Sequence, residues 1–339
     1  MPEGSLASAS GSASGALQRF EHQKPEMGLP FRIVLYAPDR TVADQAVAAA
    51  FTRIEELNDI LSDYDIDSEL SRLSRSSGEG RAVAVGPDLW RVLSRAQALA
   101  EQTDGAFDVT VGPCVNLWRR ARREGKLPDP VRLEQARRAV GYRYVHLDPA
   151  RHTAELKVPD MRLDLGGIAK GYAVDEALKV LARHGIRRAL VSGGGDLAVS
   201  EPPPGRAGWR IELPPLDVTN TPPARFVLLR NAALATSGDL FQRLEIEGRR
   251  YSHILNPRTG IGLTDHSLVT VIARDCMTAD SLTKVVSVLG PEPGLRFLES
   301  RRPPVVARVA RQPGETLEMR ETPGFRRFYE EAAFDKRSR

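Results

Sequence analysis

The order of predicted elements along the chain indicates an α+β fold. Strand-like and helix-like segments follow one another irregularly, without the regular strand–helix–strand alternation of a parallel sheet. The 339 residues are 41% hydrophobic and 27% charged, which is an ordinary globular composition with enough apolar side chains for a core. We find no internal repeat in the sequence.

The N-terminal half of the chain carries clear periodic segments. Residues 31–36 (FRIVLY) are β-branched and aromatic and predict a strand. Thr41 with Asp44 resembles a capping box, and apolar residues then recur at helical spacing to Leu61, so we expect a long helix. Asp88 is expected to cap a second helix. Residues 119–160 are charged and predict a surface excursion with short strands, whose Arg-rich start forms a solvated helix face.

The C-terminal half alternates strands with helices. A third helix is expected from about Ile168 to His184, because Gly185 suits a left-handed C-terminal cap. Thr278 is expected to cap a helix that ends at Gly290, and Pro291 to begin another. The remaining segments predict strands at 186–192, 226–230 and 267–273 and a Pro-rich loop or insertion at 201–223.

The chain divides into one domain and two terminal segments. We expect a disordered Ser/Ala/Gly-rich tail at 1–18, one domain at 19–312 and a charged extension at 313–339. The sequence has no stretch of 18 apolar residues and, as written, no secretory signal. The net charge of +4 comes from mixed basic and acidic residues, which argues against a nucleic-acid partner. Cys114 and Cys276 have no metal-binding spacing and are predicted to be buried.

The segment DLGGIAKGYAVD (164–175) combines features of a phosphate site. Asp164 precedes two glycines, which let a backbone approach a ligand closely, and Lys170 follows at the predicted helix start. The lysine can add a point charge to a phosphate, and Asp164 could hold a ribose, a ring nitrogen or a metal. Alternatively, the glycines serve only tight packing at a strand–turn–helix junction.

Two further segments carry polar side chains that could act in catalysis or bind a metal. In SHILNPRTG (252–260), His253 could act as an acid or base and Arg258 could bind a phosphate, although a plain hairpin explains the pattern equally well. In TADSLTK (278–284), Asp280 and Thr283 would share a helix face and suit Mg²⁺, or Asp280 could simply pair with Lys284.

In the segment DGAFDVTVGP (104–113), small and apolar residues stand on both sides of the carboxylate of Asp108. Small residues there would let a flat ring lie against the backbone, and Asp108 could be a buried acceptor. The other histidines fit no ligand spacing, and no GxSxG or HExxH motif supports hydrolase or protease chemistry.

These segments, in this order, resemble the FAD:protein FMN transferases of the ApbE family. Matching pieces are spread from about residue 27 to 300 and comprise MG (27–28), LSDYDIDSELSRL, DGAFDVTVGP with VNLW, DLGGIAKGYAVDEAL, GGGDLAV, ATSGD (235–239), SHILNPRTG and TADSLTKVVSVLG. The resemblance implies an ApbE-like, T-fold-related α+β fold with antiparallel sheets, flanking helices and a flavin cleft between lobes.

The resemblance also implies an activity. FMN would pass from FAD to a Ser or Thr hydroxyl of a target flavoprotein, with Mg²⁺ at the pyrophosphate and AMP as the leaving group. Two alternatives stay open: an FAD pyrophosphatase that uses water, and a non-catalytic flavin-binding protein. Related proteins are often exported to the periplasm and anchored to a membrane, although no signal or lipobox is visible in this chain.

Site residues carry over position by position. His253 resembles the histidine that assists proton transfer, and Lys170 and Asp280 are expected at the reacting pyrophosphate. Metal ligation is implied for the carbonyl of Gly167 and for Asp280, and Thr283 is the candidate for a third ligand. The residues expected to contact FAD are Met27, Tyr64, Ala106, Phe107, Asp108, Asp164, Lys170, Ile254 and Arg258.

The chain departs from the family pattern at three positions. Leu29 stands where a Thr is usual, and Asn256 where an Asp is usual. The third departure lies four residues after Asp280, where the family places Thr or Ser and this chain has Lys284. Either Thr283 takes over as metal ligand, or the Lys284 ammonium partly replaces the cation. A lysine there would weaken Mg²⁺ binding by repulsion between like charges.

Overall fold

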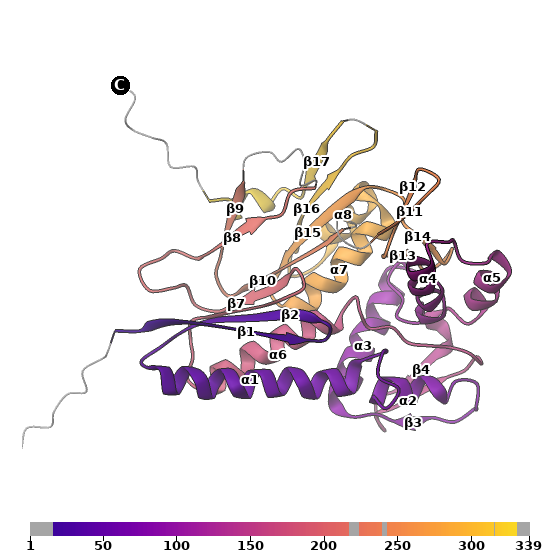
Figure 1. Ribbon diagram of the computed structural model, residues 1–339, viewed down its shortest axis with the longest axis horizontal. Helices are drawn as coiled ribbons and strands as arrows, with labels where there is room; N and C mark the ends of the chain where they lie inside the picture. The colour runs from indigo at the N-terminus through magenta and orange to yellow at the C-terminus, as the bar shows by residue number, and fades with distance from the viewer. Residues whose placement is uncertain (1–15, 217–223, 239–242, 315, 331–339) are drawn as a thin grey trace, which may run out of the picture.

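The computed structural model describes residues 16–216, 224–238, 243–314 and 316–330. Its centre is an eight-stranded sheet in which every neighbouring pair is antiparallel, which confirms the predicted α+β class (Figure 1). In spatial order the strands are β1 (Gln18–Glu26), β2 (Leu29–Ala37), β6 (Ala189–Gly193), β7 (Asp196–Val199), β10 (Ala232–Gly238), β15 (Ser267–Ala273), β16 (Val306–Arg311) and β17 (Glu318–Glu321).

Helices cover one face of this sheet. The alternation of side chains sends Phe31, Ile33 and Leu35 of β2 into the core beneath these helices, while Val34 points to the opposite face. Neighbouring helices pack against one another, and α1 runs along the lower edge of the molecule in Figure 1. The helices on this face are α1 (Arg40–Leu61), α6 (Ala169–Arg183), α7 (Cys276–Leu289) and α8 (Pro291–Ser300).

The opposite face is covered by a β-hairpin and the C-terminal segment. β8 (Trp209–Leu213) and β9 (Arg225–Leu229) pair antiparallel, and their apolar side chains pack with the fully buried Phe325 of the short helix η2 (Phe325–Phe328). The segment predicted as a charged extension therefore supplies both the edge strand β17 and a core side chain.

A second lobe lies beside the sheet. It contains the helices α2 (Glu69–Arg75), α3 (Pro87–Gln102), α4 (Gly112–Glu124) and α5 (Pro130–Arg138), the short helix η1 (Tyr142–Tyr144), and the three-stranded sheet of β3 (Val83–Ala84), β5 (Thr153–Leu156) and β4 (Val145–Asp148). Two hairpins, β11 (Arg243–Ile246) with β12 (Arg249–Ser252) and β13 (Leu255–Asn256) with β14 (Ile261–Gly262), pack on α4 through a core around Trp118. The predicted excursion at 119–160 contains the expected short strands, β4 and β5, together with the end of α4, α5 and η1.

Helix starts differ from the predicted caps. The side chain of Asp39, not Thr41, caps α1, and that of Asp275, not Thr278, caps α7, each by accepting the backbone N–H three residues on. Asp88 lies in the first turn of α3, and the N-cap is Gly86, with no side-chain cap bond. The predicted end of α6 is confirmed, because Gly185 has a φ of 80° and closes the helix.

The β1–β2 turn brings Met27 to the edge of the sheet. Glu26 pairs with Leu29, so the turn consists of two residues, and both Met27 and Gly28 have positive φ values of 50° and 74°. This is the pattern of a type I′ hairpin turn. The predicted tail at 1–18 lies outside the described residues as far as residue 15, and β1 already begins at Gln18.

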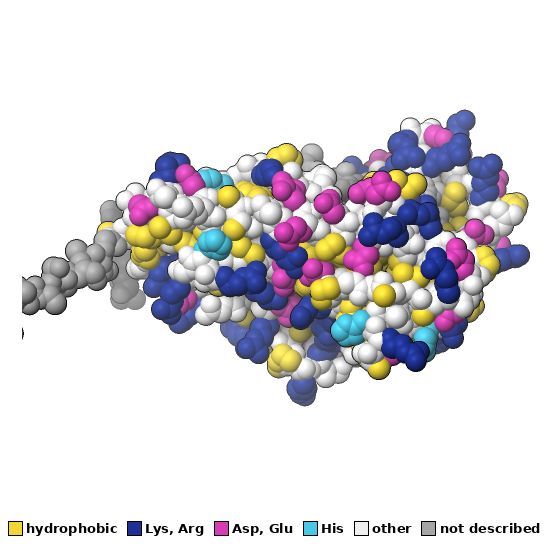
Figure 2. Space-filling model, turned by 90° about the horizontal axis from the view of Figure 1, so that it is seen from below, with side chains coloured by type: hydrophobic (Ala, Val, Ile, Leu, Met, Phe, Trp, Pro, Cys, Tyr) yellow, Lys and Arg dark blue, Asp and Glu magenta, His cyan; other side chains and the backbone are white. Residues whose placement is uncertain are grey.

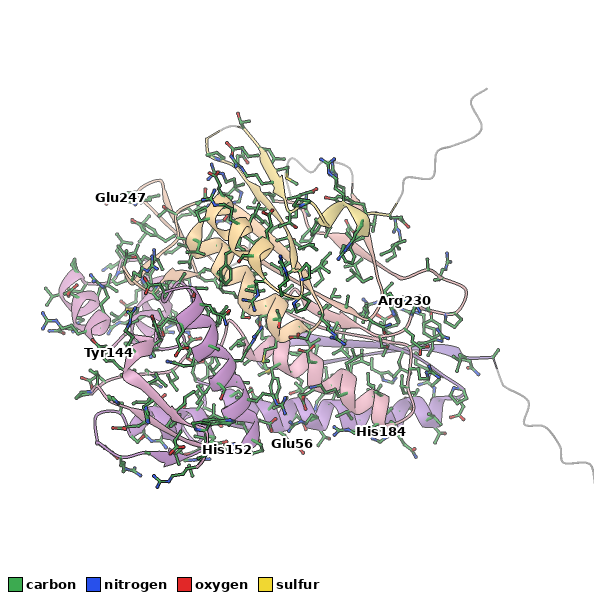
Figure 3. The ribbon with its side chains drawn as sticks, turned by 180° about the vertical axis from the view of Figure 1, so that it is seen from behind. Glu56, Tyr144, His152, His184, Arg230 and Glu247 are labelled. Carbon is green, nitrogen blue, oxygen red and sulfur yellow. The ribbon has the colours of Figure 1, made fainter. Side chains whose placement is uncertain are left out.

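The surface agrees with the charge pattern of the sequence. Figure 2 shows Lys and Arg side chains interspersed with Asp and Glu on the face seen from below, without a stripe of one sign. No helix among the described residues is long and apolar enough to cross a membrane. His152 and His184 are exposed at the periphery, as Figure 3 shows, and both described cysteines are buried and free.

Candidate active site

A cleft of about 1420 Å³ opens where the large sheet meets the second lobe. Small-molecule sites are usually roughly 300–1,000 Å³, so this cleft has room for a large ligand. Its walls come from the β1–β2 turn, the end of α1, α4, the start of α6, the β6–β7 turn, β10, the segment around His253, and α7. Most of the sequence motifs that predict chemistry, distant along the chain, therefore meet at one place.

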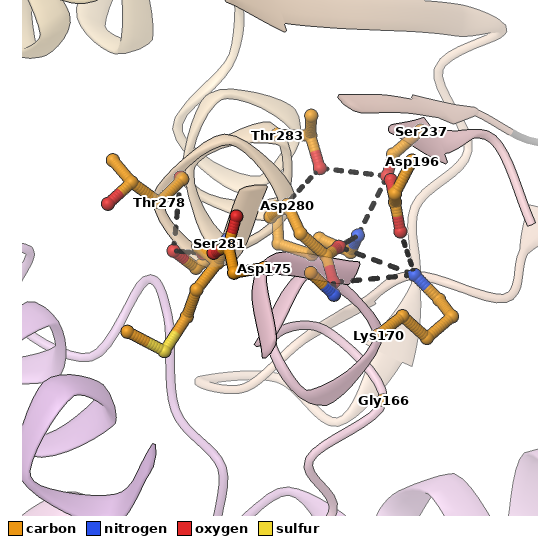
Figure 4. Close-up of polar contacts among 12 residues, drawn as sticks. Gly166, Lys170, Asp175, Asp196, Ser237, Thr278, Asp280, Ser281 and Thr283 are labelled. Atoms are coloured by element: carbon orange, nitrogen blue, oxygen red, sulfur yellow. Dashed lines mark hydrogen bonds and ion pairs between the residues drawn. The ribbon is translucent and has the colours of Figure 1, made fainter. Parts of the chain in front are cut away.

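Two lysines and two aspartates form a buried cluster on the cleft wall. The Lys170 ammonium pairs with Asp196 and lies 3.4 Å from Oδ2 of Asp280 (Figure 4). The Lys284 ammonium pairs with the other oxygen of Asp280 and donates to the hydroxyl of Ser237 at 2.9 Å. Asp280 is 0% exposed, whereas Lys170, Lys284, Asp196 and Ser237 line the cleft.

Opposite charges in this cluster favour the ionised forms of Asp280 and Lys170. Burial opposes ionisation of Asp280, but Lys170 and Lys284 outweigh it and lower the pKa of that carboxyl. Burial likewise acts to lower the pKa of Lys170, and Asp196 and Asp280 together raise it above its ordinary value. Burial and the charge of Asp280 raise the pKa of Asp196 to about 6, against the opposing effect of the lysines. Within the part of the chain that the structure describes, Oδ1 of Asp196 has no hydrogen-bond partner.

A close approach of α6 and α7 builds this cluster. A Cβ at Gly171 would collide with the carbonyl oxygen of Cys276 and lie 2.9 Å from the Cβ of Asp280, so only glycine allows the two helices to meet here. The N–H of Gly171 also donates to Asp280 at 3.2 Å. Gly171, the glycine after Lys170, therefore serves the packing of α6 on α7.

A half-buried arginine lies on the opposite wall. Arg119 pairs with Asp63 and with Asp164 (2.8 Å), and its guanidinium lies 4.1 Å from the ring centroid of Tyr64. The Tyr64 side chain is 79% exposed and faces the cleft. Arg119 was predicted to lie on a solvated helix face, and this is wrong, because the side chain points to two carboxylates from other segments.

Residues 106–108 line the cleft, and hydrogen bonds of Asp108 fix the position of this segment. Ala106 and Phe107 are buried, and Asp108 accepts hydrogen bonds from the N–H and hydroxyl of Thr110 and from the N–H of Tyr142, all at 2.7–2.8 Å. Asp108 is thus the buried acceptor that the sequence allowed. Burial still raises the pKa of this carboxyl despite those bonds.

The segment SHILNPRTG forms a hairpin at the mouth of the cleft. His253 and Ile254 line the cleft just before β13, and a hydrogen bond of 2.8 Å from the indole of Trp118 to the carbonyl of Gly260 ties the turn to α4. Arg258 does not line the cleft; it is exposed and donates to the carbonyl oxygen of Asp104 at 2.8 Å. Its expected contact with the ligand is therefore not supported by this arrangement.

The predicted metal ligands do not fit a divalent cation in this structure. The Thr283 hydroxyl is fully buried and hydrogen-bonds with the carbonyl of Asp280 (2.6 Å) and with Ser237 (2.8 Å). Both carboxylate oxygens of Asp280 already face ammonium or amide hydrogens. Among the described residues, no group of three or more His, Cys, Asp or Glu side chains could hold a metal.

The sequence predicted most of the cleft residues that we assigned to the site, but several polar residues of the cleft were not predicted. All predicted site residues except Arg258, Asp280 and Thr283 line the cleft. Asp63, Arg119, Asp196 and Ser237 were assigned no site role, although Asp63, Asp196 and Ser237 stand in the quoted segments LSDYDIDSELSRL, GGGDLAV and ATSGD. Their place in those segments was the available signal. Asp239 of ATSGD lies outside the described residues.

The fold and the cleft together define an α+β protein with a large cleft between a sheet and a helical lobe. The ApbE family model matches residues 27–309. A FAD:protein FMN transferase from Vibrio cholerae is 34% identical over 295 residues, covering 86% of this chain and 87% of that protein. Another from Haemophilus influenzae is 32% identical over 252 residues, covering 73% of each. The chain belongs to the ApbE family.

Solved structures support the same assignment. The flavin transferase ApbE from Vibrio cholerae superposes with a TM-score of 0.83 at 29% identity, over 92% of this chain and 99% of that one. An ApbE protein from Thermotoga maritima superposes with a TM-score of 0.80 at 28% identity, over 93% of this chain and 100% of that one. The antiparallel ApbE-like architecture expected from the sequence is thereby confirmed.

Proposed function

We propose that this chain is a FAD:protein FMN transferase, which moves FMN from FAD to a Ser or Thr hydroxyl of a target flavoprotein. The observation that carries the proposal is the convergence of the family's segments on one cleft, with Lys170 and Lys284 on its wall. The relatives from Vibrio cholerae and Haemophilus influenzae that match most of this chain are FAD:protein FMN transferases. FAD is the substrate of that activity.

The reaction forms one bond and breaks one. The acceptor hydroxyl oxygen attacks the FMN-side phosphorus, the bond between that phosphorus and the bridging oxygen breaks, and AMP leaves with the bridging oxygen. The hydroxyl proton passes to a base, for which His253 is the candidate because it lines the cleft. Lys170 and Lys284 would face the charge that develops on the phosphate oxygens, which is the main requirement of phosphoryl transfer.

The other cleft residues would bind and orient FAD. Tyr64, exposed and supported by Arg119, offers a platform for a flat ring. Met27, Ala106, Phe107 and Ile254 provide apolar surface, and Asp164 and the carbonyl of Gly167 provide acceptors. The roles expected for these residues from the family resemblance are consistent with their positions. Arg258 would contribute indirectly, because its hydrogen bond to the carbonyl of Asp104 fixes the segment that carries Ala106 and Phe107.

The Mg²⁺ expected from the sequence is the part of the proposal that the site supports least. A divalent ion at the pyrophosphate would neutralise charge when bound. The proposed ligands Asp280 and Thr283 instead make hydrogen bonds and ion pairs with protein groups, so these two side chains do not offer a metal site.

The experiment that tests the proposed activity follows both products of FAD. The purified protein is incubated with FAD, with or without an acceptor flavoprotein carrying a Ser/Thr-Gly-Ala-type motif, and AMP is quantified by chromatography. AMP that forms only with the acceptor supports the transferase. AMP that forms equally with water alone identifies a pyrophosphatase, and bound FAD without AMP identifies a flavin-binding protein; either result contradicts the proposal.

A further inference from the structure

The Lys284 side chain fills the space between two of the expected metal ligands. Its Cγ and Cδ atoms lie 3.4 and 3.6 Å from where a Cβ of Gly167 would stand, so its stem packs over that glycine. Its ammonium then reaches the carboxylate of Asp280 and the hydroxyl of Ser237. A cationic side chain therefore lies between Gly167 and Asp280 and pairs with the carboxylate that was expected to bind the metal.

The cluster is already neutral without a metal. Lys170 and Lys284 supply two positive charges, and Asp196 and Asp280 supply two negative charges. A divalent cation inserted here would add two uncompensated charges beside two ammonium groups. It could bind Asp280 only by displacing an ammonium, which would then be buried without its partner.

Lys284 also keeps a donor for a ligand. An ammonium has three N–H groups, and the contacts with Asp280 and Ser237 account for two of them. Lys284 lines the cleft, so the third N–H can point to an anionic oxygen of a ligand bound there. Such a contact supplies positive charge at the place where the expected ion would supply it, and its position is fixed by the helix.

We propose that the ammonium of Lys284 is a built-in cation that takes the place of a divalent metal in this site. It follows that FAD binding and FMN transfer by this chain do not depend on Mg²⁺. This inference rests on the proposed function for its ligand, FAD. Replacement of Lys284 by threonine should open the space at Gly167 and Asp280 and create a Mg²⁺ site that the natural chain lacks.

The test measures binding, so that it does not require turnover. Mg²⁺ alone is titrated by calorimetry into the wild type, Lys284→Thr and the control Lys179→Thr, and FAD binding is measured in EDTA and in Mg²⁺. Lys179 is a suitable control because its side chain is 59% exposed and pairs with Glu176 outside the cleft. We expect no Mg²⁺ binding by the wild type or control, and FAD affinities that are equal in EDTA and Mg²⁺.

Lys284→Thr should behave differently in both measurements. We expect it to bind Mg²⁺, to lose FAD affinity by about ten-fold in EDTA, and to recover that affinity in Mg²⁺. Lys284→Arg retains the positive charge and should bind FAD without Mg²⁺; it also keeps the test decisive if the threonine variant does not fold. An increase of about ten-fold or more in wild-type FAD affinity on adding Mg²⁺ would overturn the proposal.

The test of Lys284 can be decided independently of the test of FMN transfer. If FAD binds but no AMP forms in any condition, the proposed activity fails while the affinities still decide the role of Lys284. If FAD does not bind, the calorimetric titration with Mg²⁺ alone decides it: a gain of Mg²⁺ binding in Lys284→Thr supports the inference, and no gain overturns it.

Discussion

The ammonium of Lys284 and the carboxylate of Asp280 form an ion pair one helical turn apart on α7, with Asp280 completely buried. Asp280 also accepts the N–H of Gly171 and faces the ammonium of Lys170, so one carboxylate joins the two helices that approach at the cleft. The same residue that the sequence proposed as a metal ligand is, in this structure, the anion that holds two lysines in place.

Replacing Asp280 should therefore destabilise the protein. In Asp280→Asn the carboxylate is lost, and Lys170 and Lys284 keep only Asp196 as a negative partner. Removal of one partner from a buried ion pair costs about 3–5 kcal/mol, so the free energy of unfolding should fall by that amount in urea denaturation. Glu292→Gln, which removes an exposed i,i+4 pair with Arg296, is the control and should stay near the wild-type value. An equally small effect of both substitutions would refute the structural role of Asp280.

His253 should affect the transfer step more than binding. A base in the transition state contributes about 100-fold or more, so His253→Ala should slow single-turnover FMN transfer by at least that factor while FAD affinity stays near normal. His184→Ala is the matched control, because His184 is exposed at the end of α6, away from the cleft (Figure 3). Transfer at the wild-type rate in His253→Ala would remove this residue from the mechanism.

Arg119 should contribute to FAD affinity through its neighbours. In Arg119→Gln, Asp63 and Asp164 lose their shared cation and Tyr64 loses the guanidinium that stacks on it. We expect FAD binding, measured by flavin fluorescence, to weaken by about ten-fold. Arg120→Gln on the same helix removes only an exposed pair with Glu124 and should bind FAD normally. Equal affinities of the two variants would contradict this account.

The hydrogen bond of Trp118 links α4 to the His253 hairpin. Trp118→Phe leaves the buried carbonyl of Gly260 without its donor, which should lower the free energy of unfolding by about 1–3 kcal/mol and slow transfer. Trp209→Phe loses a comparable bond to the carbonyl of Glu201, 2.9 Å long, on the opposite face of the sheet. It should lose similar stability with an unchanged transfer rate; parallel losses of rate in both variants would disprove the link.

Asp175 should make stability fall as pH rises. Burial raises the pKa of this carboxyl from 3.8 to about 7, with a further contribution from Asp275, against the backbone N–H groups of Cys276 and Met277 and the charge of Lys179. Because the folded-state pKa lies above the unfolded one, the folded state retains the proton longer, and stability is lost as pH rises from about 4 to about 7, by up to about 4 kcal/mol.

The amide isostere isolates this contribution. Asp175→Asn mimics the protonated carboxyl, so its free energy of unfolding should decline less than that of the wild type between about pH 5 and about pH 8. Urea denaturation of both proteins at the two pH values gives the comparison. Identical declines would show that Asp175 does not titrate in this range.

Helices and strands could be predicted from the sequence where a single hydrophobic pattern determines the element. The apolar run 31–36 lies within β2, and residues 267–273 form β15 as predicted. The caps at Thr41 and Thr278 were wrong because an aspartate stands two or three residues before each of them and its carboxylate takes the N–H. Strand β1 was not predicted, because its sequence is mostly polar and its extended conformation depends on pairing with β2.

The charged part of the site depends on tertiary contacts that no local pattern contains. Arg119 meets Asp63 and Asp164, which lie 56 and 45 residues away in sequence. A run of arginines on a helix gives no indication that one of them pairs with carboxylates of other segments. The i,i+4 pair of Asp280 and Lys284, in contrast, was visible as an alternative interpretation, and the structure contains it.

The most direct measurement of the central claim is the mass of the acceptor. The wild-type protein is incubated with FAD and an acceptor flavoprotein, and with the same acceptor whose motif hydroxyl is replaced by Ala. We expect a mass gain of one FMN on the first acceptor, with an equal amount of AMP, and no mass gain on the second. An acceptor of unchanged mass, or equal labelling of both, would contradict it.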